Sequence, residues 1–85
     1  MFTVKFIVYD RDTDIDNYYS YMCDLKECSF NCYTLHYTDL NNDNDFIGCI
    51  VPNNDNTTMI ICSIITDIIN KFCNDRKRLY EINVY

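Results

Sequence analysis

The chain has 85 residues, of which 48% are hydrophobic and 15% aromatic, and these proportions exclude a disordered tail and indicate one compact domain spanning residues 1–85. The formal net charge of −6 argues against nucleic acids and anionic membranes as partners, because both need a basic surface. Only Arg76, Lys77 and Arg78 form a cationic cluster. We expect instead a protein partner with a basic surface, which long-range attraction would steer into contact.

The composition is skewed in a way that points to the coding sequence. Ala, Gln and Trp are absent, while Ile, Asn and Asp each occur 11 times. Ile, Asn, Tyr, Phe and Lys have AT-rich codons, so the skew suggests a large AT-rich DNA virus, a parasite or a low-GC bacterium. With one Gly and one Pro in the chain, the turns must be built largely from Asn and Asp.

The first third of the chain predicts a strand, a loop and a short helix. Residues 2–9 alternate, with Phe2, Val4, Phe6 and Val8 on one face, and this predicts a strand. Residues 10–17 (DRDTDIDN) are typical of a charged loop. Residues 18–28 fit a helical stripe, although their tyrosines favour strands, and we interpret them as a short helix.

The middle of the chain predicts a β-hairpin. Residues 30–38 alternate, with Tyr33, Leu35 and Tyr37 on one face. Residues 39–45 (DLNNDND) have the composition of a turn. Residues 46–51 (FIGCIV) are almost continuously apolar, which is typical of a central strand.

The last third predicts the main helix, residues about 56–74, and a final strand. Asp55, Asn56 and Thr57 are candidate N-caps. Apolar residues then recur at helical spacing, at Ile61, Ile64, Ile65, Ile68 and Phe72. Residues 79–85 alternate like a strand. The elements together predict an α+β fold in which one helix covers a mostly antiparallel sheet of about four strands.

The six cysteines would form a disulfide framework in a secreted protein. The amino-terminal segment has a lysine inside a brief apolar stretch and no signal-peptide pattern, so we expect a cytoplasmic protein with reduced thiols. The longest apolar run, residues 59–69, is interrupted by Ser63, Thr66 and Asp67 and is too short to span a bilayer.

Two patterns of donor residues resemble parts of metal sites. Zinc would need Cys23, Cys28, Cys32 and His36, but in a strand Cys28 and His36 would lie about 26 Å apart, and no C-x-x-C pair occurs. Calcium loops beginning at Asp10 or Asp39 would lack the required Gly at position 6 and Glu at position 12. We therefore expect no metal and no cofactor.

Catalysis is also not indicated. His36 is the only histidine, and Ser29 and Ser63 belong to no nucleophile motif. The lone Gly48 lies in a predicted strand, so no glycine-rich loop can cradle a phosphate. We expect a protein that is not an enzyme.

Acidic and aromatic residues lie close together in residues 10–21, and this combination is common at protein interfaces. The predicted partner-binding residues are Asp10, Asp12, Asp14, Asp16, Tyr18, Tyr19 and Tyr21. Tyr19 and Met22 also form a Y-x-x-M string that resembles the docking motif for the SH2 domains of phosphoinositide 3-kinase, but tyrosines packing an amphipathic segment explain it as well.

By composition and size, the chain resembles the small accessory proteins of poxviruses and similar AT-rich cytoplasmic DNA viruses. This resemblance implies a protein that binds and antagonises a host factor, often in innate immune signalling. Residues 46–72 resemble part of a BTB or Skp1-like adaptor, and a truncated adaptor of this kind is an alternative function. A further alternative is self-association through an unpaired edge, at residues 2–9 or 79–85.

Overall fold

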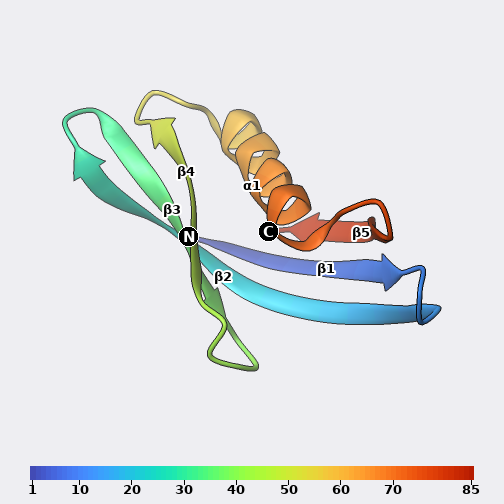
Figure 1. Ribbon diagram of the computed structural model, residues 1–85. Coiled ribbons are helices and arrows are strands. Elements are labelled where there is room, and N and C mark those ends of the chain that lie inside the picture. Colours follow the sequence, from blue (N-terminus) through green and yellow to red (C-terminus); the bar gives the residue numbers. More distant parts are fainter.

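The computed structural model describes residues 1–85 as a curled antiparallel sheet with one helix in its hollow (Figure 1). The elements are β1 (Phe2–Asp10), β2 (Ile15–Ser29), β3 (Cys32–Asp39), β4 (Phe46–Pro52), α1 (Thr57–Phe72) and β5 (Lys77–Val84). The five strands lie in the order β4-β3-β2-β1-β5, and every neighbouring pair is antiparallel. The predicted α+β class is confirmed, with five strands instead of about four.

The core lies between the concave face of the sheet and α1. Side chains alternate between the two faces along each strand, as the sequence predicted for residues 2–9 and 30–38. The buried core consists of Val4, Phe6, Val8, Tyr21, Cys23, Leu35, Tyr37, Val51, Ile64 and Ile68. The other face of the sheet has no element packed on it, so its outward side chains meet solvent (Figure 1).

The prediction for residues 10–28 was wrong. In place of a loop and a short helix, the longest strand, β2, begins at Ile15 and pairs with β1 on one side and β3 on the other. Its tyrosines favour a strand, and pairing along both edges outweighs the weak helical spacing. The turn between β1 and β2 shortens to residues 11–14, where Asp14 adopts a positive φ of 53°.

Two strand positions also differ from the sequence interpretation. The predicted hairpin of residues 30–38 and 46–51 is confirmed as β3 and β4. However, β4 is an edge strand, not a central one, and β1 is an interior strand, not a free edge. An apolar run does not reveal whether a strand is paired on both sides. It also does not reveal which side chains face the core: Val51 is buried, whereas Ile47 and Ile50 are each 65% exposed.

The helix begins and ends close to where the sequence predicts. Asn56 is its N-cap, and the Asn56 side chain accepts a hydrogen bond of 2.9 Å from the backbone N–H of Met59. The last turn is closed by a hydrogen bond from Cys73 N–H to the carbonyl of Ile69. Ile64 and Ile68 are fully buried, which confirms the predicted apolar face.

One buried carboxylate fastens the helix to the sheet. Asp67 on α1 is the only charged residue in the buried set. One of its oxygens accepts a hydrogen bond of 2.7 Å from the Tyr37 hydroxyl on β3, and both accept from the backbone N–H of Cys49 on β4 at 3.1 Å. The carboxylate therefore satisfies a backbone donor on an edge strand as well as a buried hydroxyl.

Gly48 is required by this arrangement. A Cβ atom at position 48 would collide with the Asp67 carboxylate and would lie 2.7 Å from Cε2 of Tyr37. The only glycine of the chain therefore stands where any side chain on β4 would occupy the space of the buried carboxylate.

Stacked aromatic rings fill the space between the sheet and the end of α1. Tyr37 and Phe46 stack with ring centroids 4.4 Å apart, and Phe6 lies 5.0 Å from both Tyr19 and Phe72. Such pairs add about 0.5–1.5 kcal/mol each to the effect of burial alone.

We predict that Gly48→Ala lowers the free energy of unfolding by about 1–3 kcal/mol, because the new methyl group must displace the Asp67 carboxylate or the Tyr37 ring. Urea denaturation measures this change. Cys62→Ala, at an exposed position of α1, is the control and should change stability by less than about 0.5 kcal/mol. Equal stabilities for the two variants would contradict the close packing at Gly48.

We also predict that stability falls at alkaline pH. Burial raises the pKa of Tyr21 to about 12 and that of Cys23 to about 11, and burial together with the Asp67 hydrogen bond raises the pKa of Tyr37. The unfolded chain releases these protons nearer pH 9 to 10. The free energy of unfolding therefore falls from about pH 9 upward until the groups of the folded protein ionise as well. Urea midpoints between pH 8 and 12 measure the decline, and a constant midpoint would contradict it.

Candidate functional site

The predicted partner-binding carboxylates surround the turn between β1 and β2. The Asp10 side chain accepts a hydrogen bond of 2.9 Å from the backbone N–H of Asp12. The Tyr9 hydroxyl donates a 2.6 Å hydrogen bond to Asp14, and this bond raises the pKa of Tyr9. Local contacts therefore shape the turn, as is usual for Asp-rich turns.

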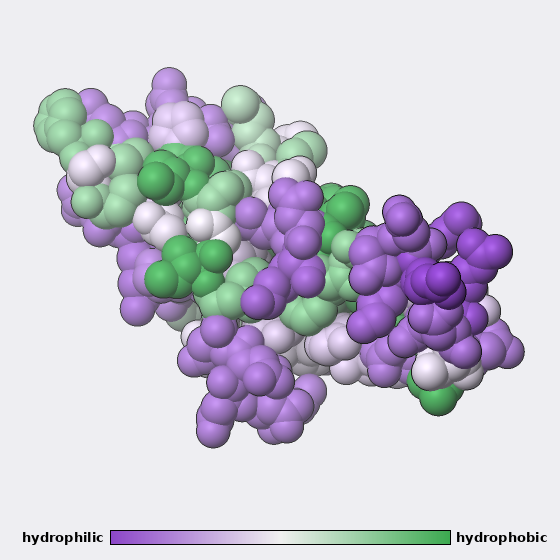
Figure 2. Space-filling model, viewed as in Figure 1, coloured by the Kyte–Doolittle hydropathy of each residue, from purple (hydrophilic) through white to green (hydrophobic).

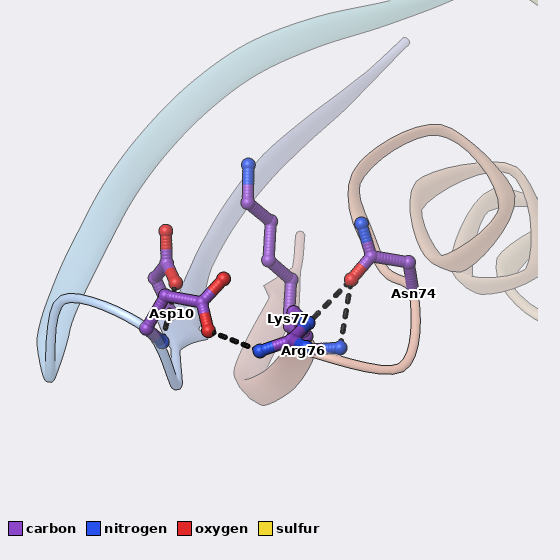
Figure 3. Close-up of polar contacts among 5 residues, drawn as sticks. Asp10, Asn74, Arg76 and Lys77 are labelled. Carbon is purple, nitrogen blue, oxygen red and sulfur yellow. Dashed lines mark hydrogen bonds and ion pairs between the residues drawn. The ribbon is translucent and has the colours of Figure 1, made fainter.

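The loop between α1 and β5 docks against this turn (Figure 3). The Arg76 guanidinium forms an ion pair of 2.6 Å with Asp12, and the Arg76 carbonyl accepts a hydrogen bond of 2.7 Å from Arg11 N–H. Asn74 holds the loop in shape, since its side-chain oxygen accepts from the backbone N–H groups of Arg76 and Lys77 at 2.8 and 3.0 Å. Residues far apart in the sequence thus form one charged end.

The charges at this end nearly cancel. Its carboxylates are Asp10, Asp12, Asp14, Asp16 and Asp75, and its cations are Arg11, Arg76, Lys77 and Arg78. Five negative and four positive charges leave a local charge of −1. The surface view shows this end as the most hydrophilic part of the molecule, at the right of Figure 2. The segment predicted to be a charged loop therefore lies beside the only basic cluster in the chain.

The three tyrosines of the predicted site do not share a surface. Tyr18 points outward and is 72% exposed. Tyr19 faces the other way, and its ring lies 5.0 Å from that of Phe6 and 4.7 Å from that of Phe72. Tyr21 is only 1% exposed and belongs to the core. In a strand, neighbours alternate between faces, so Tyr18 alone of the three stands fully on the surface.

A shallow hollow of about 570 Å³ lies beside the charged end. It is lined by Tyr9, Arg11, Arg78, Leu79 and Tyr80. Guanidinium groups and aromatic rings together favour a planar anion. The carboxylates nearby compete for the same guanidinium groups, and none of the side chains that line the hollow is buried.

Away from the charged end, β4 carries exposed apolar side chains. Ile47 and Ile50 project from the outward side of β4, and Figure 2 shows hydrophobic surface gathered over this strand, at the left. Phe30, at the turn between β2 and β3, is 89% exposed, and Met59 in the first turn of α1 is 52% exposed. Sequence reasoning missed this surface because it assigned residues 46–51 to the sheet centre. We call Ile47, Ile50 and Phe30 the apolar end.

The cysteines of the zinc-like pattern lie in different surroundings. Cys28 and Cys32 face each other across the turn between β2 and β3, with their sulfur atoms 3.0 Å apart. Cys23 is fully buried in the core. No three His, Cys, Asp or Glu side chains lie close enough together to hold a metal ion.

No family model matches this chain, and neither the curated proteins nor the solved structures contain a significant match to it. No helix of the structure is long and apolar enough to cross a membrane. The element order strand, turn, helix over residues 46–72 agrees with the sequence interpretation, while the resemblance of this segment to an adaptor stays a prediction.

We predict that Asp12→Asn changes the free energy of unfolding by less than about 1 kcal/mol, because the Asp12–Arg76 pair is solvent-exposed and weak. Asp43→Asn removes the same charge from an exposed loop and is the control. Thermal denaturation at low and high salt measures both variants. A loss above about 2 kcal/mol for Asp12→Asn alone would mean that the ion pair is a major support of the fold.

Proposed function

We propose that this protein is a non-enzymatic protein-binding module and that its apolar end, centred on β4, is the binding surface. The observation that carries the proposal is the position of Ile47 and Ile50. Both side chains are 65% exposed, and they belong to an edge strand that contains no charged residue. A strand edge without charges is the kind that natural proteins usually cover or protect.

The size of the exposed side chains supports this choice. Fully burying an isoleucine contributes about 1.5–3 kcal/mol relative to leaving it in water. Two such residues with Phe30 nearby can supply most of the energy of a hot spot, since a few central anchors dominate typical interfaces. Scattered apolar residues are normal on protein surfaces, but Ile47 and Ile50 project from the same side of one edge strand.

Charge favours a partner with basic residues beside an apolar contact. Asp39 ends β3, Asp43 and Asp45 lie in the loop before β4, and the whole chain has a net charge of −6. The charged end attracts a basic partner much less, because its carboxylates lie among cations. A basic partner would therefore be attracted at long range and would dock its apolar residues on β4.

Composition supports the rest of the proposal. The AT-rich coding bias and small size fit a viral accessory protein that blocks a host factor in the cytosol, with innate immune signalling as the expected pathway.

The alternative is self-association through the β5 edge, where Tyr80 and Tyr85 are 72% and 65% exposed. Lys77, Arg78 and Glu81 oppose that pairing, since charges on an edge strand discourage it.

The experiment is a pull-down from eukaryotic cytosol at low and high salt, followed by affinity measurement with the purified partner. Three proteins are compared: wild type, Ile47→Ser with Ile50→Ser, and Asp12→Asn with Asp14→Asn and Asp16→Asn. We expect the isoleucine variant to bind at least about tenfold more weakly, because each truncated anchor costs about 1 kcal/mol or more. The aspartate variant should bind within about threefold of the wild type at physiological salt.

The outcomes separate the alternatives. Loss of binding only in the aspartate variant would move the site to residues 10–21. Equal binding by all three proteins would contradict the proposed surface. If the tagged protein recovers only further copies of itself, self-association becomes the better explanation, and sedimentation measures its stoichiometry.

A further inference from the structure

Two cysteine side chains meet at the turn between β2 and β3. The Cys28 and Cys32 sulfur atoms are 3.0 Å apart, and the Ser29 hydroxyl oxygen lies 2.7 Å from the Cys32 sulfur. The chain reverses at Phe30 and Asn31, where Asn31 adopts a positive φ of 63°. Cys28 is exposed and Cys32 is half-buried, so reagents in solution can reach the pair.

An irregularity in the strand pairing produces this contact. Glu27 pairs with Tyr33 and Ser29 pairs with Cys32, which leaves Cys28 without a partner on β3. A bulge of this kind re-aims the side chain of the extra residue. The Cys28 side chain is thereby turned toward the side of the hairpin that carries the Cys32 thiol.

We propose that Cys28 and Cys32 form a redox-active pair that a small disulfide, such as glutathione disulfide, converts reversibly into an intramolecular disulfide. A disulfide bond is about 2.05 Å long, so the two sulfur atoms need to approach by only about 1 Å. Side-chain movement at a surface turn provides that approach without unfolding the sheet. The proposal does not depend on the proposed binding surface.

The reaction proceeds by two exchange steps. The Cys28 thiolate attacks one sulfur of glutathione disulfide, forms a mixed disulfide and releases one glutathione thiolate. The Cys32 thiolate then attacks the Cys28 sulfur, closes the intramolecular bond and releases the second glutathione. The protein loses two protons and two electrons, and one external disulfide becomes two thiols.

Local hydrogen bonds make Cys28 the attacking group. A hydrogen bond with the Cys32 thiol is the main cause of the lowered pKa of Cys28. Hydrogen bonds with the Thr34 and Ser29 side chains lower this pKa further. Burial raises the pKa of Cys23 to about 11 and also raises those of Cys49 and Cys73. Cys62 is exposed, but the only contact between two thiols is that of Cys28 with Cys32. Oxidation should therefore select the Cys28–Cys32 pair from among the six cysteines.

Closing the bond would fix the turn that presents Phe30. Asn31 joins this turn to the chain just after β4. Its carbonyl accepts a hydrogen bond of 3.0 Å from the backbone N–H of Asn53, and its side-chain oxygen accepts one of 3.1 Å from the Asn53 side-chain amide. The disulfide would thus lock one side of the apolar end.

The test incubates the full chain with reduced glutathione and glutathione disulfide at set ratios, traps free thiols with N-ethylmaleimide and locates modified cysteines by peptide mass spectrometry. We expect Cys28 and Cys32 to lose their thiols together. Cys28→Ser should slow the reaction with glutathione disulfide at least about tenfold, whereas Cys62→Ser should leave the rate unchanged. In Cys32→Ser, glutathione should accumulate on Cys28.

A second measurement needs no substitution. In the wild type, the Cβ chemical shifts of Cys28 and Cys32 should move together to disulfide values as the glutathione disulfide ratio rises. Stable glutathione adducts on wild-type Cys28, a disulfide that joins other cysteines, or equal rates for Cys28→Ser and Cys62→Ser would each overturn the proposal.

Discussion

The hydrogen bonds to Asp67 are the interaction on which the rest of the structure depends. A carboxylate inside a protein is costly unless donors replace the water that it loses. Here the donors are the Tyr37 hydroxyl and the Cys49 backbone N–H, which belong to two adjacent strands, while Asp67 itself belongs to the helix. One side chain therefore fixes where α1 lies along β3 and β4. It also explains why glycine stands at position 48, because any side chain there would occupy the space of the carboxylate.

The placement of the helix decides which surfaces stay free. With α1 in the hollow of the sheet, the inward side chains of β4, such as Val51, are buried, and the outward ones, such as Ile47, remain in solvent. At the other end, the loop that follows α1 brings Arg76 against Asp12 and neutralises much of the acidic turn. The molecule, which measures 44 × 23 × 20 Å, thus has a charged end and an apolar end. The apolar end is the one with free hydrophobic surface for a partner.

Local patterns in the sequence predicted the elements whose structure is determined locally. The N-cap candidates Asp55, Asn56 and Thr57 and the isoleucine spacing predicted α1, in which Asn56 is the N-cap. Strict alternation predicted β1 and β3. The predictions that were wrong depend on how strands pair with one another. A helical stripe in residues 18–28 carries no information about the two strands that enclose it, and the apolar residues of β4 do not reveal that one side of this strand is unpaired. Arg76 and Asp12 lie 64 positions apart, so chain order could not show that the acidic and basic segments meet. The signal for Asp67 was present, since it stands between Ile64 and Ile68 on the buried face of the helix.

A double-mutant cycle of Tyr37→Phe and Asp67→Asn tests the central interaction most directly. Urea denaturation of the wild type, both single variants and the double variant gives the coupling free energy between the two side chains. We expect a coupling of about 1–3 kcal/mol, because each single change leaves the other group without its partner in the core. Tyr37→Phe combined with Asp43→Asn is the control pair and should be additive. Additivity within about 0.3 kcal/mol for Tyr37 and Asp67 would contradict the view that this hydrogen bond holds the helix on the sheet.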